Sequence, residues 1–291
     1  MSLSANEPED FARALRKRFR IHGIVDLHDL AGEIGLRIKE VDAQGFEGAL
    51  IRAANKPHGI IALRRAIREP GRKRFTIAHE LGHFVLPGHG ITGRTCNGEN
   101  IESKNKRVPA HEASANMFAS ELLLPIVEVQ PIVQARLASI ETAEFLGSTY
   151  GTSLTAALLK SSDVANERCC VVVSRDEMIE WAKPNDSFKH FIGRRERLSD
   201  ASLAAKLIGG GIEERVSGLV PAEAWLDDSH LRPGAMIYED SVLQSHYNSV
   251  LTILTITEPL SEQGLDDEDS LLDELDPDEF SLSRRRWPGR R

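Results

Sequence analysis

The chain has 291 residues and a formal net charge of -8, and 41% of its residues are hydrophobic. This length suggests two or three domains with packed cores, and the acidic balance argues against nonspecific affinity for nucleic acid. No apolar run is long enough to span a membrane, and the first ten residues, three of them acidic, do not resemble a signal peptide. We therefore expect a cytoplasmic protein without membrane contact.

The three cysteines do not form a metal-binding or redox motif. Cys169 and Cys170 are adjacent and Cys96 is distant, so no C-x-x-C spacing occurs. Adjacent residues of a strand point to opposite faces, so these two cysteines are poorly placed to pair with each other. We interpret all three as reduced core thiols, which fits the cytoplasm.

The first 86 residues predict a small α+β unit. Apolar residues recur there at helical spacing or alternate at strand spacing, and turn signals separate these segments. In chain order, the predicted elements are helices at 8–20 and 25–35, a strand at 36–41, a hairpin formed by 48–51 and 59–63, and a helix at 74–85. We interpret Pro70-Gly71 as a break before the last helix and Pro87-Gly88 as its end.

The helix at 74–85 carries His79, Glu80 and His83 in the pattern His-Glu-x-x-His. Because residues four apart lie on one face of a helix, both imidazoles can reach a single metal ion. Glu80 is then close enough to take a proton from a zinc-bound water. The pattern predicts a Zn2+ site with His79 and His83 as ligands and Glu80 as the catalytic base. Such a site needs a third protein ligand.

The next predicted helix offers two carboxylates, Glu112 and Glu121, for that third position. Small residues share the face of Glu112 and would let the two helices approach closely: Ala115, Asn116 and Ala119. Glu121 lies nine residues after Glu112 and therefore on the opposite side, where we interpret it as a solvent-facing charge. Helix geometry therefore favours Glu112 as the third ligand. Asn116, one turn after Glu112, is placed to hydrogen-bond the Glu112 carboxylate.

His89 is an alternative third ligand. Its spacing from His79 and His83 matches the elongated three-histidine zinc motif. That motif has a glycine where this chain has Leu86, although the turn signal that follows Leu86 could still bring His89 back towards the metal. Two weaker candidates, Glu99 and Glu102, lie in a polar loop.

Residues 74–83 (RFTIAHELGH) and 112–125 (EASANMFASELLLP) resemble the ImmA/IrrE family of metallopeptidases. The family pattern is a His-Glu-x-x-His helix followed by Glu-x-x-Ala-Asn-x-Phe-Ala-x-x-Leu-Leu-x-Pro. The resemblance is close over residues 74–125 and looser over the first 73. It implies a zincin-like fold, Glu112 as the third zinc ligand, and a specific protein substrate. That substrate is typically a helix-turn-helix (HTH) transcriptional repressor cleaved under stress or during mobile-element induction.

Residues 126–165 predict a helical, HTH-like segment, which the resemblance also implies. Its last two helices are predicted at 141–150 and 154–161, around a break at Gly151. Between Leu137 and Glu167, Lys160 is the only basic residue, and the same stretch contains several acidic residues. A DNA-reading helix needs cations to contact phosphates, so direct DNA binding is disfavoured. We expect a packing or substrate-docking role.

Residues 166–260 predict an α+β C-terminal regulatory or substrate-docking domain. Its main elements are a buried strand at 169–174, a helix at 202–208 and a long strand at 249–256. The basic-aromatic stretch 188–197 is interpreted as a solvated face. Residues 261–291 predict a disordered acidic and basic tail, so the chain divides at residues 125, 165 and 260.

These patterns together predict an α+β, zinc-dependent endopeptidase. Glu80 would take a proton from the attacking water and return it to the leaving amine. His111 and Tyr150 are candidates for stabilising the oxyanion. The alternative is a non-proteolytic regulatory or binding protein that keeps the zinc fold, such as a toxin–antitoxin component or a transcriptional regulator. The intact Glu80 favours the peptidase.

Overall fold

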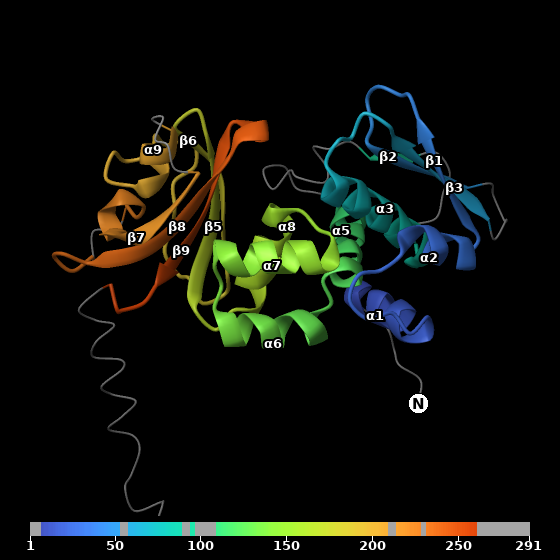
Figure 1. Cartoon of the computed structure of the whole chain (residues 1–291), viewed down its shortest axis with the longest axis horizontal. Helices are drawn as coiled ribbons and strands as arrows, with labels where there is room; N and C mark the ends of the chain where they lie inside the picture. The colour runs from blue at the N-terminus through green and yellow to red at the C-terminus, as the bar shows by residue number, and fades with distance from the viewer. Residues whose placement is uncertain are drawn as a thin grey trace, which may run out of the picture.

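The computed structural model describes residues 7–52, 58–88, 94–96, 109–208, 214–227 and 231–260. Three parts lie side by side: an N-terminal α+β part, a middle group of helices, and a C-terminal antiparallel sheet (Figure 1). The predicted α+β class is confirmed by the two sheets and the helices around them. Within the described residues, no helix is long and apolar enough to cross a membrane.

The N-terminal part contains a four-stranded sheet with helices on one face. Its elements are α1 (Pro8–Arg18), α2 (Leu27–Glu33), β1 (Leu36–Val41), β2 (Gly48–Arg52), β3 (Gly59–Arg64), α3 (Pro70–Val85), β4 (Arg94–Cys96) and α5 (Ala110–Leu123). The strand order is β1-β3-β2-β4, in which β1 runs parallel to β3 and the other pairs are antiparallel. The β2–β3 pairing confirms the predicted hairpin. Apolar residues of all four helices form one core with the inner face of the sheet.

Helix α3 begins earlier than the sequence predicted. Pro70 occupies the start of the helix and Gly71 lies in its first turn, so the interpretation of this pair as a break was wrong. Proline suits the first turn because its fixed φ is helical and its missing N–H needs no partner there. Gly71 allows close packing: a Cβ at this position would lie 2.4 Å from the backbone nitrogen of Ser153. The turn before Ser153 therefore rests directly on the start of α3.

The middle part consists of α6 (Ile126–Arg136), α7 (Ile140–Tyr150) and α8 (Leu154–Val164). The hydroxyls of Ser139 and Ser153 cap the N-termini of α7 and α8, and Gly151 ends α7 in the left-handed conformation. Helix α8 packs against α6, α7 and β5. Asp163 is the one exposed residue of α8, and the other residues of this helix are buried or partly buried.

Glu121 of α5 is buried, with 1% of its side chain exposed, so its interpretation as a solvent-facing charge was wrong. Lys160 of α8 donates to it at 2.9 Å, Arg13 of α1 lies at 3.3 Å, and the backbone N–H of Ile126 donates at 3.2 Å. Glu121 does lie away from α3, but that side of α5 meets α1, α6 and α8. Two cations and a backbone donor compensate the burial of this carboxylate.

The C-terminal part is a five-stranded antiparallel sheet. Its elements are β5 (Arg168–Arg175), β6 (Met178–Pro184), α9 (Leu203–Ile208), β7 (Arg215–Pro221), β8 (Met236–Gln244) and β9 (Ser249–Ile256), with short 3-10 turns at Ala222–Ala224 and Ser245–Tyr247. The strand order is β6-β5-β9-β8-β7. The predicted strands and helix of this region are confirmed, and Cys169 and Cys170 are both buried in β5.

Two neighbouring carboxylates on β8 attach helices to opposite faces of this sheet. Asp240 accepts from the backbone N–H of Ile140 at the start of α7, at 2.9 Å. Glu239 accepts from the backbone N–H groups of Leu203 and Ala204 at the start of α9, and from Trp225 Nε1 at 2.8 Å. The bond from Ile140 to Asp240 thereby joins the middle part to the C-terminal part. The predicted domain boundaries stay a prediction, and the predicted tail at 261–291 lies outside the described residues.

Candidate metal centre

His79 and His83 lie on consecutive turns of α3 and point to the same place. Their Nε2 atoms are 3.0 Å apart, and their rings meet edge to face with centroids 4.6 Å apart. His79 is fully buried and His83 is 5% exposed. The i, i+4 spacing therefore produces the convergence that the sequence pattern predicts.

Glu112 of α5 completes the group. Its Oε2 atom lies 3.2 Å from His79 Nε2 and 3.6 Å from His83 Nε2. The two helices approach closely because Gly82 of α3 faces Ala115, where an added Cβ would lie 3.3 Å from the Ala115 Cα. Within the described part of the chain, His79, His83 and Glu112 are the one group of His, Cys, Asp or Glu side chains that could hold a metal ion.

The donor atoms of this group fit a cation. Imidazole nitrogens and a carboxylate oxygen that face each other at about 3 Å need a shared proton or a metal between them. Burial acts to raise the pKa of Glu112, but its contacts with His79 and His83 outweigh burial and hold that pKa well below its ordinary value. The carboxylate is therefore ionised at neutral pH, which is the form that binds metal.

Asn116 contacts a different ligand from the one predicted. Its Oδ1 atom lies 2.8 Å from His79 Nδ1, whereas the sequence placed Asn116 against Glu112. When Oδ1 accepts this hydrogen bond, the His79 proton is on Nδ1, and the lone pair of Nε2 faces His83 and Glu112. Asn116 does lie on the side of α5 that meets α3, as its place beside Glu112 predicts, but its amide reaches across to α3. Asn116 therefore orients a histidine rather than the carboxylate.

Glu80 is fully buried beside the histidines and lies against strand β2. A Cβ added to Gly48 would lie 2.9 Å from Glu80 Oε1 and 2.5 Å from Thr76 Cγ2. Only glycine lets β2 pass this close to α3. Gly48 is thus a residue of the site that sequence reasoning missed, although a glycine at the start of a buried strand is a usable signal of close backbone approach.

The two oxyanion candidates lie in different places. His111, which is 32% exposed, has its Nε2 atom 3.2 Å from Glu112 Oε1, and its ring centroid is 6.1 Å from that of His83. Tyr150 instead donates to Glu128 Oε2 at 3.2 Å. Burial and the adjacent Glu128 raise the pKa of Tyr150 to about 12. Tyr150 is therefore occupied in the packing of α6 and α7, and His111 is the candidate that adjoins the metal ligands.

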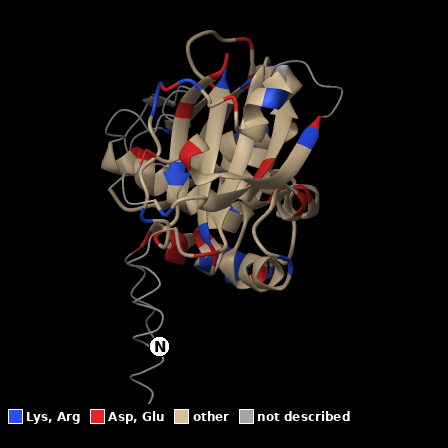
Figure 2. Ribbon diagram, turned by 90° about the vertical axis from the view of Figure 1, so that its left-hand side faces the viewer, with Lys and Arg blue, Asp and Glu red and all other residues tan. Residues whose placement is uncertain are grey.

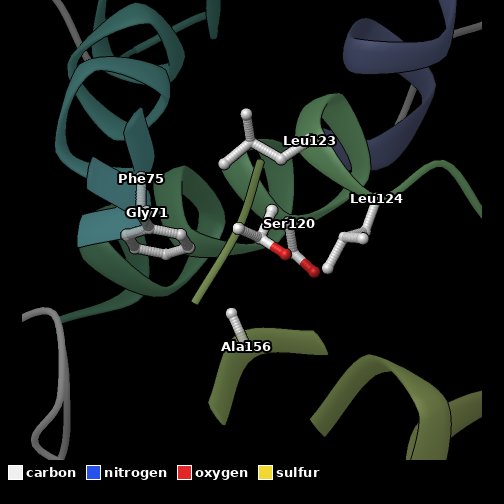
Figure 3. A pocket seen from close by; sticks show the side chains of 7 residues that line it. Gly71, Phe75, Ser120, Leu123, Leu124 and Ala156 are labelled. Atoms are coloured by element: carbon white, nitrogen blue, oxygen red, sulfur yellow. The ribbon is translucent and has the colours of Figure 1, made fainter. Parts of the chain in front are cut away.

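The remaining ligand candidates, His89, Glu99 and Glu102, lie outside the described residues. A small cavity of about 20 Å³ is present beside α3 (Figure 3). It is lined by Gly71, Phe75, Ser120, Leu123, Leu124, Thr152 and Ala156. This volume fits about one water molecule, so the cavity is too small for a peptide. It marks the junction of α3, α5 and the α7–α8 turn.

One family model matches the part of the chain that contains this site. Residues 31–162 match the family model of Peptidase_M78, described as the IrrE N-terminal-like domain. The matched segment includes His79, Glu80, His83 and Glu112. No curated protein sequence matches the chain.

The fold of nearly the whole chain is also found in a solved structure. A Mycobacterium tuberculosis transcriptional regulator has a TM-score of 0.53 and 15% identity, covering 86% of this chain and 89% of that chain. At this identity the likeness concerns the fold alone. The sequence match assigns residues 31–162, which carry α3 and α5, to the IrrE N-terminal-like domain of Peptidase_M78, and it supports membership of the ImmA/IrrE family.

Proposed function

We propose that this protein is a zinc-dependent endopeptidase that cleaves a specific protein substrate. His79, His83 and Glu112 would hold the zinc ion, and Glu80 would act as the base. The observation that carries the proposal is the convergence of three buried donor groups from two helices, beside a second buried carboxylate, Glu80. Two imidazoles and one carboxylate form a ligand set of catalytic zinc, which leaves a coordination position open.

The residues of the site have separate roles in this chemistry. A bound zinc ion supplies the Lewis acidity that polarises a peptide carbonyl and makes water acidic. Glu80 takes the proton of the attacking water and returns it to the leaving amine. Asn116 keeps His79 in the tautomer whose Nε2 faces the centre. Gly48 keeps β2 close enough to hold Glu80 between strand and helix.

The substrate class rests on the family. We propose an HTH-type transcriptional repressor, cleaved in a stress response or in mobile-element regulation, as the partner. Such a substrate would place the protein in the cytoplasm.

A DNA-binding regulator is the second candidate, because the similar Mycobacterium tuberculosis protein is named a transcriptional regulator. Two observations weigh against it. In helix α8, the second helix of the HTH-like pair α7–α8, the residues are buried or partly buried except for one exposed residue, the acidic Asp163. On the side of the C-terminal sheet, Lys and Arg positions are interspersed with Asp and Glu positions (Figure 2). A groove-reading helix needs a free face and nearby cations.

Co-expression of the full chain with a repressor encoded beside its gene tests the proposal. The wild type should produce a cut repressor, and Glu80→Gln should leave the repressor intact while still binding zinc. Glu33→Gln, at an exposed position on α2, is the matched control and should cleave like the wild type. Cleavage by both the wild type and Glu80→Gln, or by neither with zinc bound, would contradict the peptidase.

A further inference from the structure

The two oxygens of Glu112 have different surroundings. Oε2 faces the Nε2 atoms of His79 and His83, at 3.2 and 3.6 Å. Oε1 faces His111 Nε2, at 3.2 Å. His111 directly precedes Glu112 in the first turn of α5, and its half-exposed ring reaches back to the carboxylate from outside the centre. One oxygen is therefore turned to the two histidines of α3 and the other to the ring nitrogen of His111.

This division matters because a carboxylate can bind a metal through one oxygen or through two. Binding through both oxygens would fill a further coordination position, which a hydrolytic zinc site keeps open for water and substrate. An N–H donor on Oε1 engages its lone pairs and fixes the rotation of the carboxylate. Holding the Glu112 carboxylate in this orientation costs little conformational entropy, because His111 and Glu112 belong to the same helical turn.

We propose that His111 is a positioning residue that holds Glu112 as a one-oxygen metal ligand. The inference rests on the proposed zinc site and extends it to a residue outside the ligand set. It also replaces the oxyanion role expected for His111 from the sequence. The Nε2 atom that would stabilise an oxyanion is the atom already directed at Glu112 Oε1.

Two substitutions separate these roles. His111→Ala removes the donor, and His111→Gln restores one, because the side-chain amide of Gln carries an N–H at about the reach of His Nε2. His28→Ala, at an exposed position on α2, is the control. The metal-free full-length proteins would be titrated with Zn2+ against a chromophoric chelator, and with Co2+ while visible absorption is recorded. Circular dichroism verifies that each variant is folded.

We expect His111→Ala to bind Zn2+ about 10–100-fold more weakly than the wild type. Its Co2+ absorption should also be weaker, because a carboxylate free to bind through both oxygens raises the coordination number above four. His111→Gln should regain most of the affinity and the spectrum.

Wild-type Zn2+ affinity and Co2+ absorption in His111→Ala would overturn the inference, and a loss of cleavage alone would then assign His111 to the oxyanion. Equal weakening in His111→Ala and His111→Gln would also overturn it, because the hydrogen bond would not be the cause. A wild-type protein that binds neither metal would instead contradict the proposed zinc site. The two failures are therefore distinguishable.

Discussion

Asn116 Oδ1 lies 2.8 Å from His79 Nδ1, so the other ring nitrogen of His79, Nε2, faces the candidate metal centre. The two residues come from different helices, α5 and α3. The contact therefore joins the helix that carries two ligands to the helix that carries the third. A change at Asn116 should alter the centre without removing a ligand.

Asn116→Leu should weaken Zn2+ binding by about 10–100-fold, because His79 loses the acceptor that fixes its tautomer and ring orientation. Asn116→Asp keeps an acceptor for His79 Nδ1. Its Zn2+ affinity should therefore be close to that of the wild type and no lower than that of Asn116→Leu. Competition with a chelator gives both affinities. Equal affinity of Asn116→Leu and the wild type would show that the contact does not orient the ligand.

Gly48→Ala should disturb Glu80 because the new Cβ would meet both Glu80 and Thr76 at less than 3 Å. We expect a loss of about 1–3 kcal/mol in the free energy of unfolding and slower cleavage, with zinc still bound. Gly32→Ala is the control, since an added Cβ there has no neighbour within 4 Å and alanine favours the helix. Urea denaturation of the two variants provides the comparison, and equal stability would refute the close approach.

We expect Tyr150 to make the stability of the protein depend on pH at alkaline pH. Its pKa is raised to about 12 in the folded protein, from about 10 in the unfolded chain. The contribution of Tyr150 to the free energy of unfolding is complete below pH 10. It is lost as the pH rises from 10 through the folded-state pKa, because between these two pKa values Tyr150 ionises only in the unfolded chain. The loss approaches about 2–3 kcal/mol. Tyr150→Phe should lack this component, and parallel stability curves for both proteins between pH 10 and 12 would contradict the assignment.

Glu239→Ala should be among the most destabilising single changes in the C-terminal part. It leaves the backbone N–H groups that start α9 and the indole of Trp225 without their acceptor. We expect a loss of about 3 kcal/mol in the free energy of unfolding. Glu223→Ala, at an exposed position after β7, should change stability by less than about 0.5 kcal/mol. A similar effect of both changes on urea denaturation would refute this role of Glu239.

The candidate site was predictable where local geometry decides it. The convergence of His79 and His83 follows from helix periodicity alone, and the small residues around Glu112 indicate a close helix contact. Most of the strands and helices likewise follow from local apolar patterns.

The errors concern residues whose surroundings come from distant parts of the chain. Glu121 is buried because α1 and α8 arrive on the far side of α5, which a single helix pattern does not reveal. Asn116 meets His79, and Gly48 meets Glu80, through packing between elements. Pro70 was taken for a break because proline both ends helices and begins them, and only the chain before it distinguishes the two.

The zinc content of Glu112→Ala and Glu80→Gln tests the central claim most directly. In the proposed mechanism, Glu112 is a metal ligand and Glu80 is a base that does not hold the metal. Purified Glu80→Gln should therefore contain as much zinc per chain as the wild type, and Glu112→Ala should lose nearly all of it. Full zinc content in Glu112→Ala would contradict the account and would direct the search for the third ligand back to His89.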